Sequence, residues 1–400
     1  MDTVRIGIIG AGNMGSNHVK MIGAGEVPGL TLAAVADRKP ERLEAALKNS
    51  GLQLSTYASG SDLIKDGKVD AVIIATPHYQ HPTLTIEALN AGLHVLCEKP
   101  AGVYTKQVRE ANAVAAASDK TYAIMFNQRT NCIYRKMHEI IASGEMGKIR
   151  RVNWLITNWY RSQSYYDSGA WRATWAGEGG GVLLNQCPHN LDLWQWLCGL
   201  PTTIRAFLQE GKWHDIEVED DVTAYADYKQ GPDAPYISEK GATGVFITST
   251  GDTPGDNRLE ILMDGGKLIA ENDKLMRWDL KTWEPEFTAT YKGGFGEPEY
   301  DVYEVETDGY NPQHKGVLIK FAEHILHGEP LVAPGIEGIR GLMISNAMHL
   351  SSWLGKPVNL PVDEDLYYEE LMKRAATSRH KEETGIIFNT DGSYNAGAKK

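Results

Sequence analysis

The sequence is poor in the features that mark several classes of protein. Its 4 cysteines form no Cys-x-x-Cys pair and are too few for a disulfide framework, so we expect reduced thiols. No apolar run approaches the roughly 20 residues of a membrane span. The chain leads straight into a strand pattern without a cleavable leader. We therefore expect a cytoplasmic protein with no membrane partner.

Positive charge is also scarce. The chain has 40 Lys and Arg against 52 Asp and Glu, which leaves a formal net charge of −12. Without a positive field to hold a phosphate backbone, nucleic acid is not an expected partner. With 400 residues, of which 42% are hydrophobic, the chain can instead build the cores of two or three globular domains.

The first third alternates short apolar strand patterns with helical ones. This alternation predicts a parallel sheet covered by helices on both faces, that is, a doubly wound α/β domain over residues 1–126. The predicted strands are Val4–Ile9, Leu32–Ala36, Ala71–Ala75, His94–Cys97 and Tyr122–Phe126. The helices between them are predicted at Met14–Ile22, Glu41–Lys48, Thr83–Ala91 and Lys106–Ala117.

The pattern changes after a helical link at Ile133–Ser143. Period-two alternation without intervening helices predicts a mainly antiparallel sheet, so residues 127–377 are expected to form an α+β domain. Its strands are predicted at Ile149–Thr157, Thr203–Leu208, Val222–Tyr228, Gly244–Ser249, Leu259–Met263 and Lys267–Ala270, and its helices at Gly181–Cys198, Gln313–His327 and Ile336–Leu354. Residues 271–311 indicate an insertion or a long hairpin. The polar tail, 378–400, is expected to fray unless another subunit holds it.

A glycine-rich turn joins the first predicted strand to the first predicted helix, with the sequence Gly10-Ala11-Gly12-Asn13-Met14-Gly15. Strand, glycines and helix in this order are the context that a dinucleotide-binding turn requires. Gly10 suits the tight turn, Gly12 leaves room for a pyrophosphate, and Gly15 lets helix and strand pack closely. The helix N-terminus then attracts the phosphates.

An acidic residue, Asp37, closes the second predicted strand. At this position a carboxylate can accept hydrogen bonds from the adenosine ribose, so we expect NAD in preference to NADP. Its neighbour Arg38 leaves NADP open, because a guanidinium there can contact a 2′-phosphate.

Glu98-Lys99-Pro100 follows the predicted strand His94–Cys97, at the edge where open α/β sheets bind ligands. Lys99 is therefore aimed at the cleft, and the proline restricts the turn and permits a cis peptide bond. Lys-Pro pairs are also common on surfaces without any function, so the motif alone leaves both readings open.

A second polar group lies on the predicted helix Gly181–Cys198. Asn185, His189 and Asp192 fall at i, i+4 and i+7 and would share one face. A histidine there is a plausible proton acceptor because its ordinary pKa lies near neutrality. Pro188 weakens the prediction of an unbroken helix. Asp192 either belongs to the site or serves a structural pair with a neighbour.

These motifs together resemble the glucose-fructose oxidoreductase / inositol dehydrogenase / rhizopine-catabolism family, Gfo/Idh/MocA, over residues 3–360. Thr76-Pro77-x-x-x-His81 is similar to the family's loop beside the nicotinamide. The resemblance implies a Rossmann domain followed by an open antiparallel sheet, with the active site between them. Because the exposed sheet face often forms oligomer contacts in the family, it also implies a homodimer or homotetramer.

The resemblance implies a mechanism as well. A secondary hydroxyl of a sugar, sugar derivative or cyclitol would lose its proton to His189 while hydride passes to NAD, and Lys99 would stabilise the same oxygen. Many relatives have Asp where this chain has Asn185. Asn185 is then an orienting residue, and a lowered pKa would make Lys99 a second candidate for the proton acceptor. The cofactor-binding residues implied are Gly10, Gly12, Asn13, Met14, Gly15, Asp37, Arg38, Thr76, Pro77, His81, Glu98, Lys99 and Asn127.

Aromatic residues interleaved with arginines suggest a carbohydrate pocket, because ring C–H faces stack on them and hydroxyls need donors. Arg161 and Arg172 suit an anionic substituent such as carboxylate or sulfonate. The tryptophans fit a core or an oligomer interface equally well. The predicted substrate-binding residues are Lys99, Arg129, Trp159, Tyr160, Arg161, Trp171, Arg172, Asn185, His189 and His314. The acidic stretch His214–Asp221 resembles a metal site in composition, but we expect its acids to begin a solvated strand and predict no metal.

Three functions remain open from the sequence. The leading one is an NAD-dependent oxidoreductase acting on a sugar, a sugar derivative or inositol, which forms stoichiometric NADH. The second is an NAD-retaining glycosidase that oxidises, eliminates and re-reduces the sugar ring without net redox change. The third is a non-catalytic NAD-binding regulator, which binds the cofactor without turnover.

Overall fold

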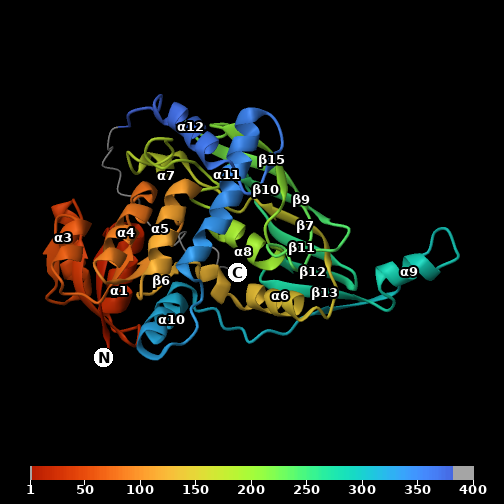
Figure 1. The fold of residues 1–400 in the computed structure, drawn as a ribbon, viewed down its shortest axis with the longest axis horizontal. Coiled ribbons are helices and arrows are strands. Elements are labelled where there is room, and N and C mark those ends of the chain that lie inside the picture. The colour runs from red at the N-terminus through yellow and green to blue at the C-terminus, as the bar shows by residue number, and fades with distance from the viewer. Residues whose placement is uncertain (1, 382–400) are drawn as a thin grey trace.

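A computed structural model describes residues 2–381 and contains two sheets (Figure 1). The first sheet is parallel, with the strand order β3-β2-β1-β4-β5-β6. Its strands are β1 (Val4–Ile9), β2 (Leu30–Ala36), β3 (Ser55–Tyr57), β4 (Ala71–Ile74), β5 (His94–Cys97) and β6 (Tyr122–Ile124). The predicted doubly wound domain is confirmed. The prediction omitted β3, whose three residues are too few to show a period.

Helices cover both faces of this sheet. They are α1 (Asn13–Gly23), α2 (Pro40–Ser50), α3 (Gly60–Lys65), α4 (His81–Asn90) and α5 (Thr105–Ala117). Two separate apolar clusters result. One contains Val19 and Ile22 of α1, and the other contains Leu63 of α3 and Leu84 of α4. The four predicted helices are present to within two residues at each end, and α3, with only six residues, was missed.

The second sheet has nine strands in the order β14-β13-β12-β11-β7-β10-β9-β8-β15. All its pairs are antiparallel except β7 with β10. The strands are β7 (Ile149–Ile156), β8 (Thr203–Glu210), β9 (Glu219–Tyr228), β10 (Ala242–Ser249), β11 (Asn257–Met263), β12 (Gly266–Glu271), β13 (Lys274–Leu280), β14 (Tyr300–Glu304) and β15 (Val358–Asn359). Burial alternates along β7, β9 and β10, so one face is packed and the other is open, as expected.

The segment that the sequence left as an insertion or a hairpin is a long hairpin. Strands β13 and β14 pair at the edge of the sheet, and the residues between them carry the short helix α9 (Glu284–Thr290). This arm projects away from the body of the molecule (Figure 1), and Phe295 at its tip is fully exposed.

The remaining helices are α6 (Cys132–Ser143), α7 (Gln163–Asp167), α8 (Pro188–Cys198), α10 (Gln313–His327), α11 (Gly338–Leu354) and α12 (Glu364–Ala375). One prediction was wrong: α8 begins at Pro188, not at Gly181, and residues 181–187 form turns. Proline is favoured at the first helical position because it has no N–H to leave unpaired, so Pro188 starts the helix and does not kink it.

Helix α10 lies far along the chain but packs on the first sheet. Val317, Leu318 and Phe321 share an apolar cluster with strand β1 and helix α1. The first parallel sheet is therefore completed by a helix that follows β14 in sequence. This return brings the ring centroid of His314, at the start of α10, to 6.1 Å from that of His18 in α1.

The first residues of the predicted tail do not fray. Ser378 donates to Glu217, Arg379 Nη1 donates to Asp215 at 2.6 Å, and Lys381 Nζ donates to the Tyr166 carbonyl at 2.8 Å. These residues are held by contacts within the same chain, whereas we expected that a second subunit would be needed to hold them. The rest of the tail lies outside the described residues. Within residues 2–381, no helix is both long and apolar enough to cross a bilayer.

Candidate active site

The glycine-rich turn has the geometry that its spacing predicts. Gly10 has φ +95°, a conformation that favours glycine, and a Cβ on Gly15 would lie 1.8 Å from the Gly10 carbonyl oxygen. A Cβ on Gly12 would instead meet nothing nearer than Arg42 Nη1 at 3.9 Å. The fold therefore requires Gly10 and Gly15 for its own packing, whereas Gly12 leaves open space at the N-terminus of α1, where a pyrophosphate fits.

Asp37 lies beside this turn. Its carboxylate accepts hydrogen bonds from the backbone N–H of Ala11 at 2.8 Å and of Lys39 at 2.9 Å, and it lies 3.5 Å from Arg42 Nη1. Arg38 is exposed. Arg42 is thus the guanidinium placed between Asp37 and Gly12. The sequence analysis missed it, although its position in the first turn of the helix after Asp37 was a usable signal.

Lys99 reaches from the end of β5 across to the second domain. Its Nζ donates a hydrogen bond to the backbone carbonyl of Asn185 at 2.8 Å. Burial lowers the pKa of Lys99, Glu98 opposes this change, and the positive charges of Arg172 and Arg161 add to it. The Lys99-Pro100 peptide bond is cis.

Glu98 points the other way, toward α1. One carboxylate oxygen lies 2.7 Å from Nε2 of the buried His18. Burial tends to raise the pKa of Glu98, but His18, with His314 and Lys99, lowers it to about 2. Glu98 is therefore a buried anion beneath Lys99, paired with a histidine that the sequence analysis did not single out.

His81 does not face the cleft. It is 1% exposed, and its ring nitrogens lie 2.7 Å from the carbonyl oxygens of Pro100 and Thr76. Both ring nitrogens are therefore occupied by backbone, so His81 positions the Thr76-Pro77 and Lys99-Pro100 loops and leaves the set of residues that can touch a cofactor.

Two polar atoms beside the glycine-rich turn and Lys99 lack partners. Thr76 Oγ1 and Asn127 Oδ1 are buried without a hydrogen bond within the described chain. Buried polar atoms normally have hydrogen-bond partners. Two such atoms without a partner at a predicted binding site are therefore consistent with hydrogen bonds to a bound cofactor. Asn127 Nδ2 contacts Gln313, at the start of α10.

His189 and Asn185 face Lys99 from the second domain. Burial, together with the positive charges of Lys99 and His314, holds the pKa of His189 well below its usual value. Asn185 Nδ2 donates to the carboxylate of Glu178, a residue 2% exposed that sequence reasoning missed. Because a carboxylate attracts the amide NH₂, Glu178 leaves Asn185 Oδ1 free to accept a hydrogen bond from another group.

Asp192 lies on α8 but not in the site. Its carboxylate forms a bidentate pair with Arg129, at 2.8 Å to Nε and 2.6 Å to Nη2, and both side chains are almost fully buried. Arg129 Nη1 also donates to Glu337 at 2.6 Å. Of the two alternatives left open by the sequence, the structure therefore supports a structural pair between Asp192 and a neighbour. Contrary to the substrate-binding prediction, the guanidinium of Arg129 is committed to these two carboxylates.

Five of the predicted substrate-binding residues lie between β7 and α8, in a segment that we call the substrate loop: Trp159, Tyr160, Arg161, Trp171 and Arg172. Trp159 is half-buried and donates to Asn190 at 3.3 Å, whereas Tyr160 is 51% exposed. The Arg172 guanidinium lies 4.6 Å from the Trp171 ring centroid, and that ring lies 5.4 Å from the buried His78. His78 is 5% exposed, with Nδ1 3.3 Å from the Glu178 carbonyl oxygen.

The acidic stretch His214–Asp221 is only partly solvated, which corrects part of the expectation. Asp215 is exposed, whereas Glu219 and Asp220, which begin β9, are both 0% exposed. Glu219 accepts hydrogen bonds from the backbone N–H groups of Gly181 and Leu183, at 2.9 and 3.0 Å, and so holds the turn that carries Asn185. Within residues 2–381, no cluster of three or more His, Cys, Asp or Glu side chains is arranged to hold a metal.

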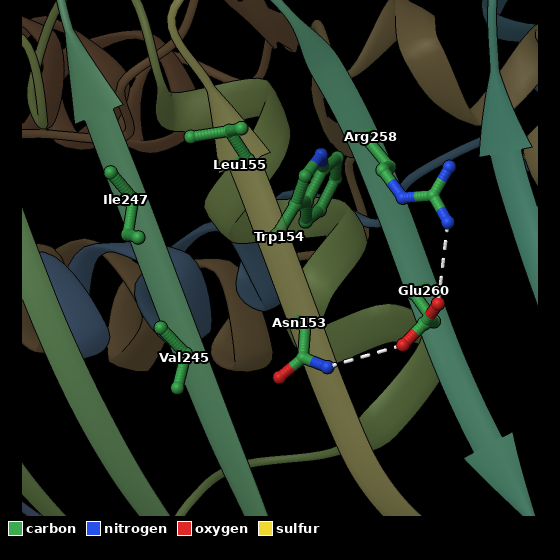
Figure 2. A pocket seen from close by; sticks show the side chains of 7 residues that line it. All are labelled: Asn153, Trp154, Leu155, Val245, Ile247, Arg258 and Glu260. Carbon is green, nitrogen blue, oxygen red and sulfur yellow. Dashed lines mark hydrogen bonds and ion pairs between the residues drawn. The ribbon is translucent and has the colours of Figure 1, made fainter.

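A hollow on the open face of the second sheet is separate from this site (Figure 2). Asn153 donates to Glu260 at 3.4 Å, as does Arg258 on the neighbouring strand. The hollow is lined by Asn153, Trp154, Leu155, Val245, Ile247, Arg258 and Glu260, and none of these belongs to the cleft residues.

The parallel sheet with its glycine-rich turn has the architecture of a dinucleotide-binding domain, and comparison with known proteins agrees. Residues 4–128 match the model of the oxidoreductase family with an NAD-binding Rossmann fold, and residues 134–269 match the Gfo/Idh/MocA C-terminal domain. The chain belongs to the Gfo/Idh/MocA family.

Among its relatives, the rhizopine catabolism protein MocA of Rhizobium meliloti is 30% identical over 64% of this chain and 74% of that protein. Myo-inositol 2-dehydrogenase of Thermotoga maritima is 24% identical over 86% of this chain and 95% of its own. Among solved structures, the WlbA dehydrogenase of Chromobacterium violaceum with NADH and UDP-GlcNAcA has a TM-score of 0.75 at 26% identity, covering 91% of this chain and 97% of that one.

The space at Gly12 supports a selective test of cofactor binding. Gly12→Ala adds a methyl group that meets no protein atom within 3.4 Å, so the melting temperature should stay unchanged. The same methyl would block a pyrophosphate, and we expect the Kd for NAD to rise at least about tenfold, or about 1.4 kcal/mol, by calorimetry. Gly231→Ala, which also adds its methyl to open space, is the matched control. An unchanged Kd would place the pyrophosphate elsewhere.

The assignment of Asp192 to structure predicts a loss of stability. Asp192→Asn leaves the buried Arg129 with Glu337 alone, and we expect the free energy of unfolding to fall by about 3 kcal/mol in denaturant titrations. The double variant Arg129→Met/Asp192→Leu removes both charges and should lose less than the single one. Unchanged stability in Asp192→Asn would contradict the structural role.

Proposed function

We propose that the protein is an NAD-dependent oxidoreductase that transfers a hydride between nicotinamide and a secondary hydroxyl of a sugar, a sugar derivative or inositol. The strongest support is the approach of Lys99, at the carboxyl edge of the sheet that carries Gly10–Gly15, to Asn185 and His189. Lys99 Nζ donates to the Asn185 carbonyl, and the charge of Lys99 lowers the pKa of His189. The relatives named as inositol dehydrogenases support the same substrate chemistry.

The cofactor would lie along the first sheet. Gly12 and the N-terminus of α1 would receive the pyrophosphate, Asp37 the adenosine ribose, and the unpaired Thr76 and Asn127 side chains the nicotinamide end. The carboxylate of Asp37 favours NAD over NADP. When bound, the cofactor supplies the hydride acceptor.

His189 accepts the proton of the substrate hydroxyl. Its lowered pKa keeps the imidazole neutral near pH 7, which is the form that can act as a base. Lys99 uses one of its three N–H groups on the Asn185 carbonyl, so two remain for the substrate oxygen. The ammonium group then stabilises the negative charge that develops as the proton leaves.

Asn185 orients the substrate. Glu178 holds its Nδ2, so Oδ1 is the atom that accepts a hydrogen bond from a second hydroxyl. Glu178 places a carboxyl group behind Asn185, where Asn185 itself has none. Burial raises the pKa of Glu178, and the positive charge of Arg172 opposes that change.

We propose further that the protein is a homodimer or a homotetramer through the open sheet face. Large apolar side chains on that sheet are exposed, with Phe207 at 57% and Tyr225 at 43%. Light scattering on the purified protein tests this directly, and a monomer would exclude it.

The function is tested by following NADH formation across a panel of sugars, acidic sugars and inositols. One NADH per oxidised substrate is the expected result. Cleavage of a glycoside without net NADH would indicate the redox-neutral glycosidase, and tight NAD binding with no turnover would indicate a regulator.

Removing either catalytic side chain should stop turnover while the cofactor still binds. We expect Lys99→Ala and His189→Ala each to lower kcat by at least about a hundredfold, with little change in the Kd for NAD. Lys106→Ala, which removes an exposed lysine paired with Asp365, is the control and should leave kcat unchanged. A near-normal kcat in either cleft variant would remove that residue from the mechanism.

The pH profile tests His189 in particular. A base works only when unprotonated, so oxidation should lose kcat/KM as pH falls through the pKa of His189. Because burial and nearby positive charge lower that pKa, the acid limb should lie below about pH 6.5, the ordinary histidine value. A limb above that pH would point to another proton acceptor.

A further inference from the structure

Two arginines of the substrate loop share one aromatic ring. The Arg161 guanidinium carbon lies 5.2 Å from the Tyr165 ring centroid, and that of Arg172 lies 4.7 Å from it. Arg172 Nη1 also donates to the Tyr165 hydroxyl at 2.9 Å. Tyr165 is 9% exposed, so the two cations are positioned against a packed side chain.

The backbone of both arginines is held by a built scaffold. The Arg161 carbonyl lies 2.8 Å from Nε2 of His214, whose other ring nitrogen lies 2.9 Å from the buried Asp220. The Arg161 N–H donates to the Thr250 carbonyl at 2.9 Å. On the other side, the Lys381 ammonium lies 3.4 Å from the Arg172 carbonyl. The backbone positions of Arg161 and Arg172, from which the two guanidinium groups extend, are therefore held by hydrogen bonds.

The positive charge of Arg161 is not balanced by the described chain. Its guanidinium contacts the carbonyls of Trp159 and Tyr160, at 3.4 and 2.8 Å, and forms no ion pair with any carboxylate in residues 2–381. Glu178, the buried acid nearby, is already bonded by Asn185 and by the Ala173 N–H. Asp167 and Asp215, also near the loop, bond Gln163 and Arg379 respectively.

Contacts through Tyr165 connect the two arginines to Lys99. The Tyr165 hydroxyl that Arg172 contacts also accepts a hydrogen bond from Gln186 Nε2 at 3.2 Å, and the preceding residue, Asn185, accepts one from Lys99 Nζ at 2.8 Å. The charges of both arginines accordingly help to lower the pKa of Lys99. Lys99, Arg161 and Arg172 bring three positive charges to this region, against the two carboxylates of Glu98 and Glu178. Positive charge is therefore in excess here, although the whole chain carries a net charge of −12, and an anionic ligand would offset it.

We propose that the substrate carries an anionic oxyacid group, a carboxylate or a sulfonate, which Arg161 binds with the help of Arg172 while Lys99 meets the reacting hydroxyl. Planar guanidinium groups suit such groups because they donate two parallel hydrogen bonds. This inference rests on the proposed function and narrows its substrate class to acidic sugars or acidic cyclitols.

The first test measures binding to the NAD-loaded protein by calorimetry, without any need for turnover. The probes are two pairs that differ in charge: glucuronic acid with glucuronamide, and 6-deoxy-6-sulfoglucose with glucose. We expect the charged member of at least one pair to bind at least tenfold more tightly, and the pair that shows this distinguishes carboxylate from sulfonate. Added salt should weaken the preference. Equal binding within both pairs, or binding of no probe, would overturn the proposal.

Variants assign the effect to Arg161. Arg161→Met should bring the charged-to-neutral ratio of affinities close to one, and Arg161→Lys should restore part of it because the charge returns without the planar fork. Arg109→Met, which removes an exposed arginine paired with Glu364, is the control and should keep the full ratio. A full ratio in Arg161→Met would overturn the assignment.

Measurements of turnover distinguish failure of the anion-site proposal from failure of the proposed oxidoreductase function. Selective binding of the acid without NADH formation would contradict the proposed oxidation and leave the anion site standing. Equal kcat/KM for the acid and its neutral partner would support the oxidation and overturn the anion site.

Discussion

The hydrogen bond from Lys99 to the Asn185 carbonyl is the constraint on which the rest of the cleft depends. It joins the end of a parallel strand in one domain to a turn in the other, so both partners must arrive at fixed positions. The first is fixed by β5 and by His81, which bridges the two neighbouring loops. The second is fixed by Glu219, whose carboxylate binds the N–H groups at the start of the turn.

Buried carboxylates carry much of this architecture. Glu219 holds the turn before α8, Glu178 holds the Asn185 amide, and Asp220 supports the loop of Arg161 through His214. Each of them accepts N–H groups that would otherwise be unpaired in the interior, where an unpaired polar group is costly. These buried acids are thus engaged by backbone and side-chain N–H groups, and the guanidinium of Arg161 forms no ion pair with a carboxylate of the described residues.

Most of the fold was predictable because its signals are local. Buried parallel strands and a glycine turn between strand and helix show in short windows, so β1, β5 and α10 were predicted at their observed bounds. One error was the omission of short elements such as β3. The other concerned Pro188, which we expected to interrupt a helix but which is the first residue of α8. Lys99, Asn185 and His189 could be named because their motifs resemble a family, whereas Glu178, His18 and Arg42 belong to no such motif.

The sequence by itself determined the order of strands and helices and the dinucleotide turn, since both depend on spacing along the chain, and the family resemblance pointed to Lys99, Asn185 and His189. Only the tertiary structure decided which partner each polar side chain takes. Asp192 and His189 are three positions apart on one helix, yet Asp192 pairs with Arg129, whereas the pKa of His189 responds to the charge of Lys99. Pairing of this kind depends on residues distant in sequence, and no local pattern contains it.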